Sequence, residues 1–275
     1  MLKKLLKYDF KSVFKYWWIA AVISFTLSIA GGVSLYLLLK EPEVPDAVIL
    51  LSGLGLLLVF LGFAAFILLS AILVFVRFYK NFFTDEGYLT FTLPVSRLHL
   101  LNSKLIMSVS TLFLTGTVCT INIFTVMGIA FHEKIFTQEF WNACAEFFAL
   151  LNKELGFYTV IYIIEILVFI IVCMIFSSLF LFCCITFASI ITKKAKVLVA
   201  IGIYYVSNSV FSFVLQIFVL LGLPSLIAWT DKISEYAAYP LIAVFLLGMI
   251  FFLAIFCGIL YILQYWMIDR KLNLN

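Results

Sequence analysis

Charged residues are scarce in this chain of 275 residues. They make up 12% of the sequence and hydrophobic residues 65%, whereas a soluble domain has about 25% charged and about 45–50% apolar residues. A soluble fold cannot hide so much apolar surface, because it still needs a polar exterior. The composition therefore excludes a soluble enzyme, a DNA-binding domain and a disordered chain. The net charge of +4 is no sign of a nucleic-acid partner.

Residues that carry catalysis are also few. The two histidines, His99 and His132, are placed on opposite sides of the membrane by the topology argued below. There is no zinc-protease motif, no Ser-His-Asp set and no pair of carboxylates on one helix, so we expect no catalytic residues and no metal site. None of the 13 glycines is followed directly by Lys, which excludes the phosphate-binding loop G-x-x-x-x-G-K-[ST]. Any coupling to ATP must come from a partner chain.

The six cysteines indicate neither a disulfide framework nor a metal centre. Five of them lie inside apolar runs, where Cys behaves as a small hydrophobic residue. Cys144 lies in a connecting segment that has no second cysteine, and the adjacent Cys183 and Cys184 lack the spacing of metal ligands. We expect all six to be structural.

The sequence does contain six long apolar runs, each with the roughly 20 residues that a helix needs to cross a bilayer. These runs lie at about 17–39, 47–76, 105–131, 157–191, 197–223 and 240–266. We therefore predict an all-α, polytopic membrane protein with six transmembrane helices in a single transmembrane domain, 1–275. The first run is too long for a signal-peptide core and no small-residue cleavage site follows, so we expect it to remain in the mature protein.

The basic residues predict how the chain is oriented, because cytoplasmic loops carry an excess of Lys and Arg. Fourteen of the 18 fall in the segments 1–16, 77–104 and 192–196 and in the tail after the last run. The other four, Lys40, Lys134, Lys153 and Lys232, lie in the alternate loops. Both termini are thus predicted to be cytoplasmic.

Two segments outside the apolar runs are predicted to be amphipathic helices. In 1–16, apolar residues recur on one helical face and five lysines lie on the others, a pattern typical of a helix in the headgroup layer. Tyr16, Trp17 and Trp18 would mark the membrane interface. The segment 132–156 predicts a short helix on the outer surface, with Thr137 as its N-cap. Either helix could serve as a simple anchor or packing element, or as a contact surface.

The longest cytoplasmic connection, 77–104, has a structured composition in which aromatic and aliphatic residues alternate with charge. Thr84 is a plausible N-cap for a short helix, with Asp85 and Glu86 in its first turn, where the helix dipole favours acids. Gly87 permits a tight turn, and Ser96 can cap the helix that leads into the third span. The segment predicts a compact, partly apolar elbow of the kind that docks a partner.

The run from Asp85 to Ser96, DEGYLTFTLPVS, resembles the first cytoplasmic loop of bacterial ABC-2-type permease subunits, and less closely that of phenol-soluble-modulin exporters. The matching residues are Asp85, Glu86, Gly87, Tyr88, Leu89, Thr92, Leu93, Pro94 and Ser96. The motif covers about a dozen residues, and the six-span topology matches over the whole chain. The short outer loop 224–239 departs from the family's sugar-polymer and lipid exporters, which puts such substrates in doubt.

This resemblance implies a permease subunit of an exporter in the bacterial plasma membrane. A coupling helix over Thr84, Asp85, Glu86, Gly87, Tyr88 and Leu89 would sit in a groove of a separate ATPase. Two ATPase subunits would hold ATP and Mg²⁺, and a second permease, identical or related, would complete the path for a hydrophobic or amphipathic substrate. No cofactor would bind to this chain itself.

Polar residues within the spans are the candidates for the substrate path. Glu165 is the only charged residue inside a predicted span, and an ionisable group there is a functional candidate by default. It could equally lie near the outer interface or bond to a neighbouring helix. Asn122, Asn208 and Gln216 are further candidates, although such amides more often join helices.

A second hypothesis is a self-contained membrane protein without an ATPase, such as a secondary carrier, a channel or an immunity factor. A carrier would have more buried charge and broken helices at the midplane, and the sequence has little of either.

Overall fold

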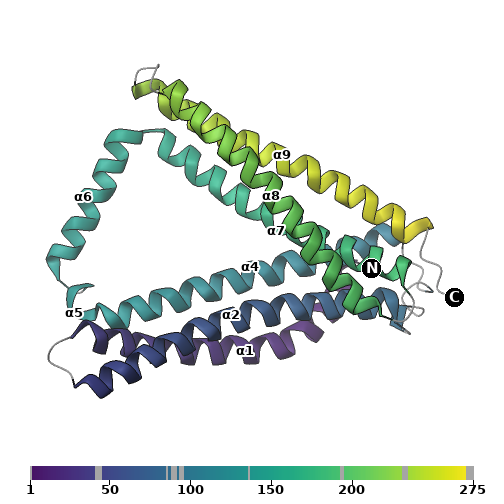
Figure 1. Cartoon of the computed structure of the whole chain (residues 1–275), viewed down its shortest axis with the longest axis horizontal. Coiled ribbons are helices and arrows are strands. Elements are labelled where there is room, and N and C mark those ends of the chain that lie inside the picture. The colour runs from purple at the N-terminus through teal and green to yellow at the C-terminus, as the bar shows by residue number, and fades with distance from the viewer. Residues whose placement is uncertain are drawn as a thin grey trace. The chain divides into compact units, whose positions relative to one another are not determined.

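The structure is a computed structural model, and it describes residues 2–40, 45–84, 86–87, 92, 96–135, 137–192, 195–230 and 235–270. These residues contain no β-strand. The helices are α1 (Leu2–Leu39), α2 (Asp46–Phe83), α4 (Arg97–Ala130), α5 (His132–Ile135), α6 (Gln138–Leu155), α7 (Tyr158–Ile191), α8 (Lys196–Thr230) and α9 (Glu235–Arg270) (Figure 1).

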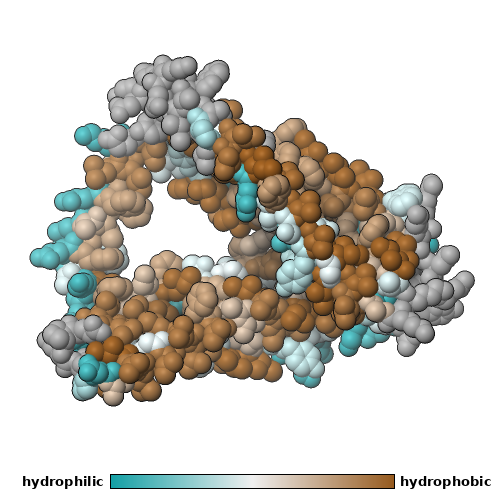
Figure 2. Space-filling view, viewed as in Figure 1, coloured by the Kyte–Doolittle hydropathy of each residue, from teal (hydrophilic) through white to brown (hydrophobic). Residues whose placement is uncertain are grey.

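The fold is all-α and polytopic, as predicted. Six helices in the described part of the chain are long and apolar enough to cross a membrane: α1, α2, α4, α7, α8 and α9. Each contains one of the predicted apolar runs to within a residue at its ends. Figure 2 shows apolar side chains over most of the visible surface of these helices, which is the surface a bilayer requires. The chain is a multi-pass membrane protein.

The chain divides into two compact units. One consists of Met1–Phe78 and Ile106–Phe148, the other of Tyr79–Leu105 and Ala149–Asn275. Helices α2, α4 and α6 contribute residues to both units. This division describes how the helices pack and does not show that either unit folds alone. The single transmembrane domain therefore stays a prediction.

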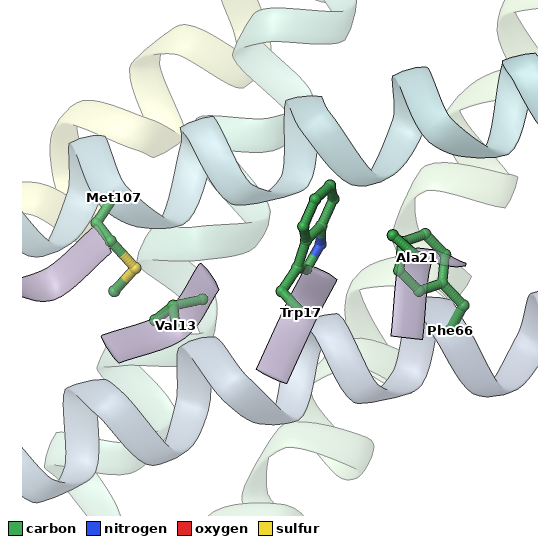
Figure 3. Packing of buried hydrophobic residues seen from close by; sticks show 5 residues of the cluster. All are labelled: Val13, Trp17, Ala21, Phe66 and Met107. Carbon is green, nitrogen blue, oxygen red and sulfur yellow. The ribbon is translucent and has the colours of Figure 1, made fainter. Parts of the chain in front are cut away.

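The first unit is held together by aromatic packing among its three long helices. Its core cluster consists of Val13, Trp17 and Ala21 from α1, Phe66 from α2 and Met107 from α4 (Figure 3). The rings of Trp17 and Phe66 lie 5.8 Å apart, and the indole Nε1 of Trp17 donates a buried hydrogen bond of 3.0 Å to Thr115 Oγ1. The expectation that Trp17 marks the membrane interface stays a prediction, but its indole is packed inside the protein, where its N–H has a hydrogen-bond partner.

The amphipathic segment 1–16 is helical, and it continues into the first span without a break. The helix continues because the residues that pack against neighbouring helices lie on the same side of it in both parts. Asp9, Val13 and Trp17 are buried at intervals of four residues, while Lys3, Lys7 and the other lysines of this segment are exposed. The face that packs in the segment is therefore the face that packs in the span, and no Gly or Pro interrupts the helix before Gly31.

At its other end α1 is tied to the short helix α5. Tyr36 donates a hydrogen bond of 2.8 Å to Glu133 Oε1, and Lys40 Nζ lies 3.7 Å from the same oxygen. The bond from Tyr36 and the charge of Lys40 lower the pKa of Glu133. The predicted outer helix is thus present as α5 and α6. Thr137 does not cap α6 as predicted, because its hydroxyl donates to the carbonyl of Lys134 at 2.6 Å.

The second unit contains α7, α8 and α9, which lie side by side (Figure 1). Phe176 of α7 stacks on Phe211 of α8 with a centroid distance of 4.7 Å, and Phe211 meets Phe256 of α9 at 5.9 Å. Gln264 Nε2 donates a buried bond of 2.7 Å to Thr186 Oγ1, which joins α9 to α7. Apolar packing and one buried amide therefore fix the three helices.

Candidate functional site

The predicted elbow lies between the end of α2 and the start of α4. Of its six proposed coupling residues, the structure describes Thr84, Glu86 and Gly87, and the other three, Asp85, Tyr88 and Leu89, lie outside the described residues. Glu86 and Gly87 are helical, and the side chain of Glu86 is exposed. The carboxylate of Glu86 therefore adds a negative charge to the surface of the elbow.

Thr84 has a different role from the one predicted. Its hydroxyl donates to the carbonyl of Lys80 at 2.6 Å, so the side chain closes the last turn of α2 and does not cap a new helix. Its backbone carbonyl accepts the N–H of Gly87 at 2.7 Å. A backbone hydrogen bond therefore joins the end of α2 to Gly87.

Gly87 is required by a close approach of the backbone. A Cβ atom at this position would lie 2.9 Å from both the carbonyl carbon and the oxygen of Phe82, closer than real Cβ contacts allow. Phe82 is fully buried, so its backbone cannot move away easily. Gly87 is helical and is not among the positive-φ glycines, so the glycine is required here by the space its side chain would need and not by a special backbone conformation.

The far side of the elbow begins with the predicted cap at Ser96. The Ser96 hydroxyl and His99 Nδ1 lie 2.8 Å apart, and the N–H of His99 donates to Ser96 Oγ at 3.4 Å. This reciprocal contact satisfies an unpaired donor in the first turn of α4. His99 is thus the partner of Ser96 in this cap.

The start of α4 is fastened to the end of α9. Arg97 Nη1 donates to the carboxylate of Asp269 at 2.8 Å and to its backbone carbonyl at 2.6 Å. Further along the same two helices, the hydroxyl of Tyr261 donates a hydrogen bond of 2.8 Å to Asn102 Oδ1. The sequence reasoning used Arg97 only to orient the chain, and missed both contacts. The contact between Arg97 and Asp269 could have been predicted from their opposite charges, since both lie at the same predicted end of a span.

Another missed residue is Asp9, an acid within the basic N-terminal segment. Its side chain is 3% exposed, and Arg77 Nε of α2 lies 3.0 Å from Asp9 Oδ1. A buried carboxylate requires such a partner. Arg77, which was used only to orient the chain, therefore also joins α2 to α1 at the end of the first unit where the elbow begins.

Glu165 is the most unusual polar residue of the spans. It lies on α7, its side chain is 5% exposed, and neither carboxylate oxygen has a hydrogen-bond partner among the described residues. The expected alternatives of an interfacial or bonded carboxylate therefore find no support here. An ionised carboxylate buried without a partner is strongly disfavoured. Glu165 can bind a proton or a cation, or face a partner that supplies one.

The three amide candidates fall into two groups. Asn122 of α4 is fully buried, and its Nδ2 donates a hydrogen bond of 3.1 Å to Ser24 Oγ of α1. This contact is the one expected of a residue that joins helices. Asn208 and Gln216 lie on α8, and both are exposed. Asn122 belongs to the first unit and the other candidates to the second, so they form no single cluster within a unit.

Metal chemistry finds no support in the described part of the chain, where no three His, Cys, Asp or Glu side chains are grouped for a metal ion. All six cysteines are free thiols. Comparison with protein-family models, with curated proteins and with solved structures finds no match. The fold and the contacts define the class of protein: a polytopic helical membrane protein.

Proposed function

We propose that this chain is the membrane-spanning permease subunit of an ATP-binding-cassette exporter of the ABC-2 type. The observation that carries the proposal is the attachment of the elbow at both ends. Gly87 folds against Phe82 at the end of α2, and Arg97 at the start of α4 is bonded to Asp269 of α9. A connection that served only as a linker would need neither attachment.

In this proposal the exposed acid Glu86 contacts a separate ATPase subunit. Closure of two such subunits around ATP and Mg²⁺ displaces the elbow. Since the elbow is bonded to α9 and is continuous with α2 and α4, the displacement moves transmembrane helices as rigid bodies. The chain supplies the path, and the partner supplies the hydrolysis.

The proposal includes a location and a substrate class. The chain lies in the bacterial plasma membrane with both termini in the cytoplasm, as the distribution of Lys and Arg favours. A second permease, identical or related, completes the path. The apolar composition of the spans suits a hydrophobic or amphipathic substrate, such as a peptide toxin or a lipid-like molecule.

The test is a charge reversal at the elbow. Glu86→Lys is expected to reduce recovery of the ATPase with the tagged chain from native membranes, because a basic side chain would replace the acid at the contact. ATP hydrolysis in the purified material should fall with it. The matched control is Glu146→Lys on α6, which makes the same change at another exposed glutamate and should leave recovery unchanged.

Two results would contradict the proposal. One is a wild-type chain that purifies from its host with no ATPase at all. The other is equal loss of the partner in Glu86→Lys and Glu146→Lys, since that would show a general effect of the charge change.

Glu165 favours a second candidate function, a carrier driven by protons. A buried carboxyl group without a partner in a span is typical of proton relays. Such a protein would need no ATPase, and the elbow would be incidental to transport. Substrate movement that follows an imposed pH gradient in vesicles holding the chain alone, and that is lost in Glu165→Gln, would favour this candidate.

A further inference from the structure

Glu165 lies on the face of α7 that packs against α8 and α9. Val172, Phe176 and Cys183 follow it by 7, 11 and 18 residues, which are close to whole turns of an α-helix, so the four residues form one stripe. The carbonyl of Val172 accepts a hydrogen bond of 3.9 Å from a thiol of α9, and Cys183 donates one of 3.5 Å to a carbonyl of the same helix. The ring of Phe176 stacks on a ring of α8 at 4.7 Å. The stripe therefore directs Glu165 into the interior of the second unit.

The carboxyl group of Glu165 has no source of positive charge at its depth in the chain. All 18 Lys and Arg residues fall outside the six apolar runs, and neither oxygen of Glu165 has a hydrogen-bond partner among the described residues. The residue is nevertheless buried, at 5% exposure. Because an isolated carboxylate in apolar surroundings is strongly disfavoured, a proton or a ligand from outside the chain has to neutralise it.

The residues that follow Glu165 on its stripe favour an organic ligand over a proton alone. Proton relays in membranes are chains of ionisable groups, whereas the next residues of the stripe are Phe169, Val172 and Phe176. Phe176 belongs to a row of aromatic rings across the second unit, since Phe211 of α8 lies 4.7 Å from Phe176 and 5.9 Å from Phe256 of α9. Over these turns the stripe offers a surface for hydrocarbon and no group that passes a proton on.

A metal ion suits the surroundings of Glu165 less well than an amine. Ca²⁺ and Mg²⁺ take about six or more oxygen ligands, and a single carboxylate supplies two oxygen atoms. In the part of the chain that the structure describes, no three His, Cys, Asp or Glu side chains are grouped for a metal ion. A protonated amine needs less, because one N–H donor and one positive charge match one carboxylate in a charge-assisted hydrogen bond.

We propose that Glu165 binds the protonated amino group of an amphipathic molecule whose hydrocarbon part lies along the apolar residues of the stripe. The inference rests on the proposed exporter for its role in transport, since it makes the substrate a cationic amphiphile, but the binding itself needs no ATPase. Because Glu165 is buried where α7 meets α8 and α9, the amine reaches it only when these helices are further apart. Binding then stabilises that open arrangement relative to the packed one.

The test is protection of Glu165 from dicyclohexylcarbodiimide, an apolar reagent for carboxyl groups, in native membranes without ATP. The probe is N,N-dimethyldodecylamine, a tertiary amine that is protonated at neutral pH and cannot be coupled to the carboxyl group. At about ten times its half-protecting concentration, it should slow the modification roughly tenfold, as read by mass spectrometry. The matched control compound is dodecanol, which has the same chain without the charge and should not protect. Glu165→Gln should abolish the modification, which identifies the labelled residue.

Each other outcome overturns the inference. Equal protection by the amine and by dodecanol would show that the chain and not the charge is recognised. Modification that neither compound slows would leave Glu165 to a proton. A wild-type Glu165 that is never modified would be closed even to a small apolar reagent, and so to the amine. All of these outcomes leave recovery of the ATPase unaffected, and a chain without an ATPase would still show protection by the amine, so the two proposals fail separately.

Discussion

Glu165 is a buried carboxyl group within a membrane-spanning helix. Its carboxylate oxygens are buried and lack hydrogen-bond partners among the described residues. A carboxyl group in apolar surroundings needs a proton, a cation or a hydrogen-bond donor to offset the cost of its burial. The physical expectation is that one of these accompanies Glu165.

This expectation can be tested by covalent labelling. Dicyclohexylcarbodiimide reacts with carboxyl groups in apolar surroundings, so we expect it to modify Glu165 in native membranes, as read by mass spectrometry of the peptide containing α7. Excess transported substrate should protect the residue if it lines the path. The matched control is Glu146 of α6, which is exposed and should stay unmodified. An unlabelled Glu165 would contradict the apolar surroundings that the structure gives this residue.

Sequence reasoning succeeded for residues whose role follows from local chemistry and failed where a distant residue decides. Ser96 was predicted correctly because capping depends on the neighbouring backbone. The contacts of Asp9 and Trp17 were missed because their partners, Arg77 and Thr115, are far along the chain. Whether Glu165 had a partner could not be predicted either, since that depends on which helices pack beside it.

The six spans were predictable at the scale of elements, because length and hydropathy suffice to identify them. The ends of the helices were less so. The prediction separated 1–16 from the first span, whereas α1 is continuous from Leu2 to Leu39. Hydrophobic periodicity identifies an apolar face in 1–16, but it does not show whether that face packs on protein or lies on lipid, and so it did not show that the helix continues into the first span. The contact between α4 and α9 was equally beyond reach, since it joins residues 172 positions apart.

That contact gives a prediction at the scale of elements. Arg97 and Asp269 are 45% and 41% exposed, so their bridge adds only about 0–1 kcal/mol to stability. Asp269→Arg should therefore leave the amount of folded protein and the bound ATPase nearly unchanged. It should uncouple ATP hydrolysis from transport, because the elbow loses its bond to α9. The measurement is transported substrate per ATP hydrolysed in proteoliposomes.

The reversed pair provides the control for this prediction. Arg97→Asp combined with Asp269→Arg restores opposite charges at the same positions, so coupling should recover relative to either single variant. Coupling that stays low in the double variant, or full coupling in both single variants, would show that the bridge does not transmit motion.

At the scale of the whole molecule, orientation in the membrane decides whether the proposed function is possible. The elbow can meet a cytoplasmic ATPase only if α2 ends on the inner side, and fourteen of the 18 basic residues favour that orientation. Both Glu86 and Glu146 are exposed. In the predicted orientation, Glu86 on the elbow would be inside the cell and Glu146 on α6 would be outside.

This arrangement predicts a difference in labelling between two single-cysteine variants in a background without native cysteines. Glu146→Cys should react with an impermeant maleimide in intact cells, and Glu86→Cys only after the cells are permeabilised. Equal labelling of both after permeabilisation is the control for thiol reactivity. Reaction of Glu86→Cys in intact cells would place the elbow outside, where no ATP-hydrolysing partner can reach it. Such a result would remove the physical basis of the exporter and leave the proton-driven carrier, whose candidate residue Glu165 lies within a span and needs no partner on either side.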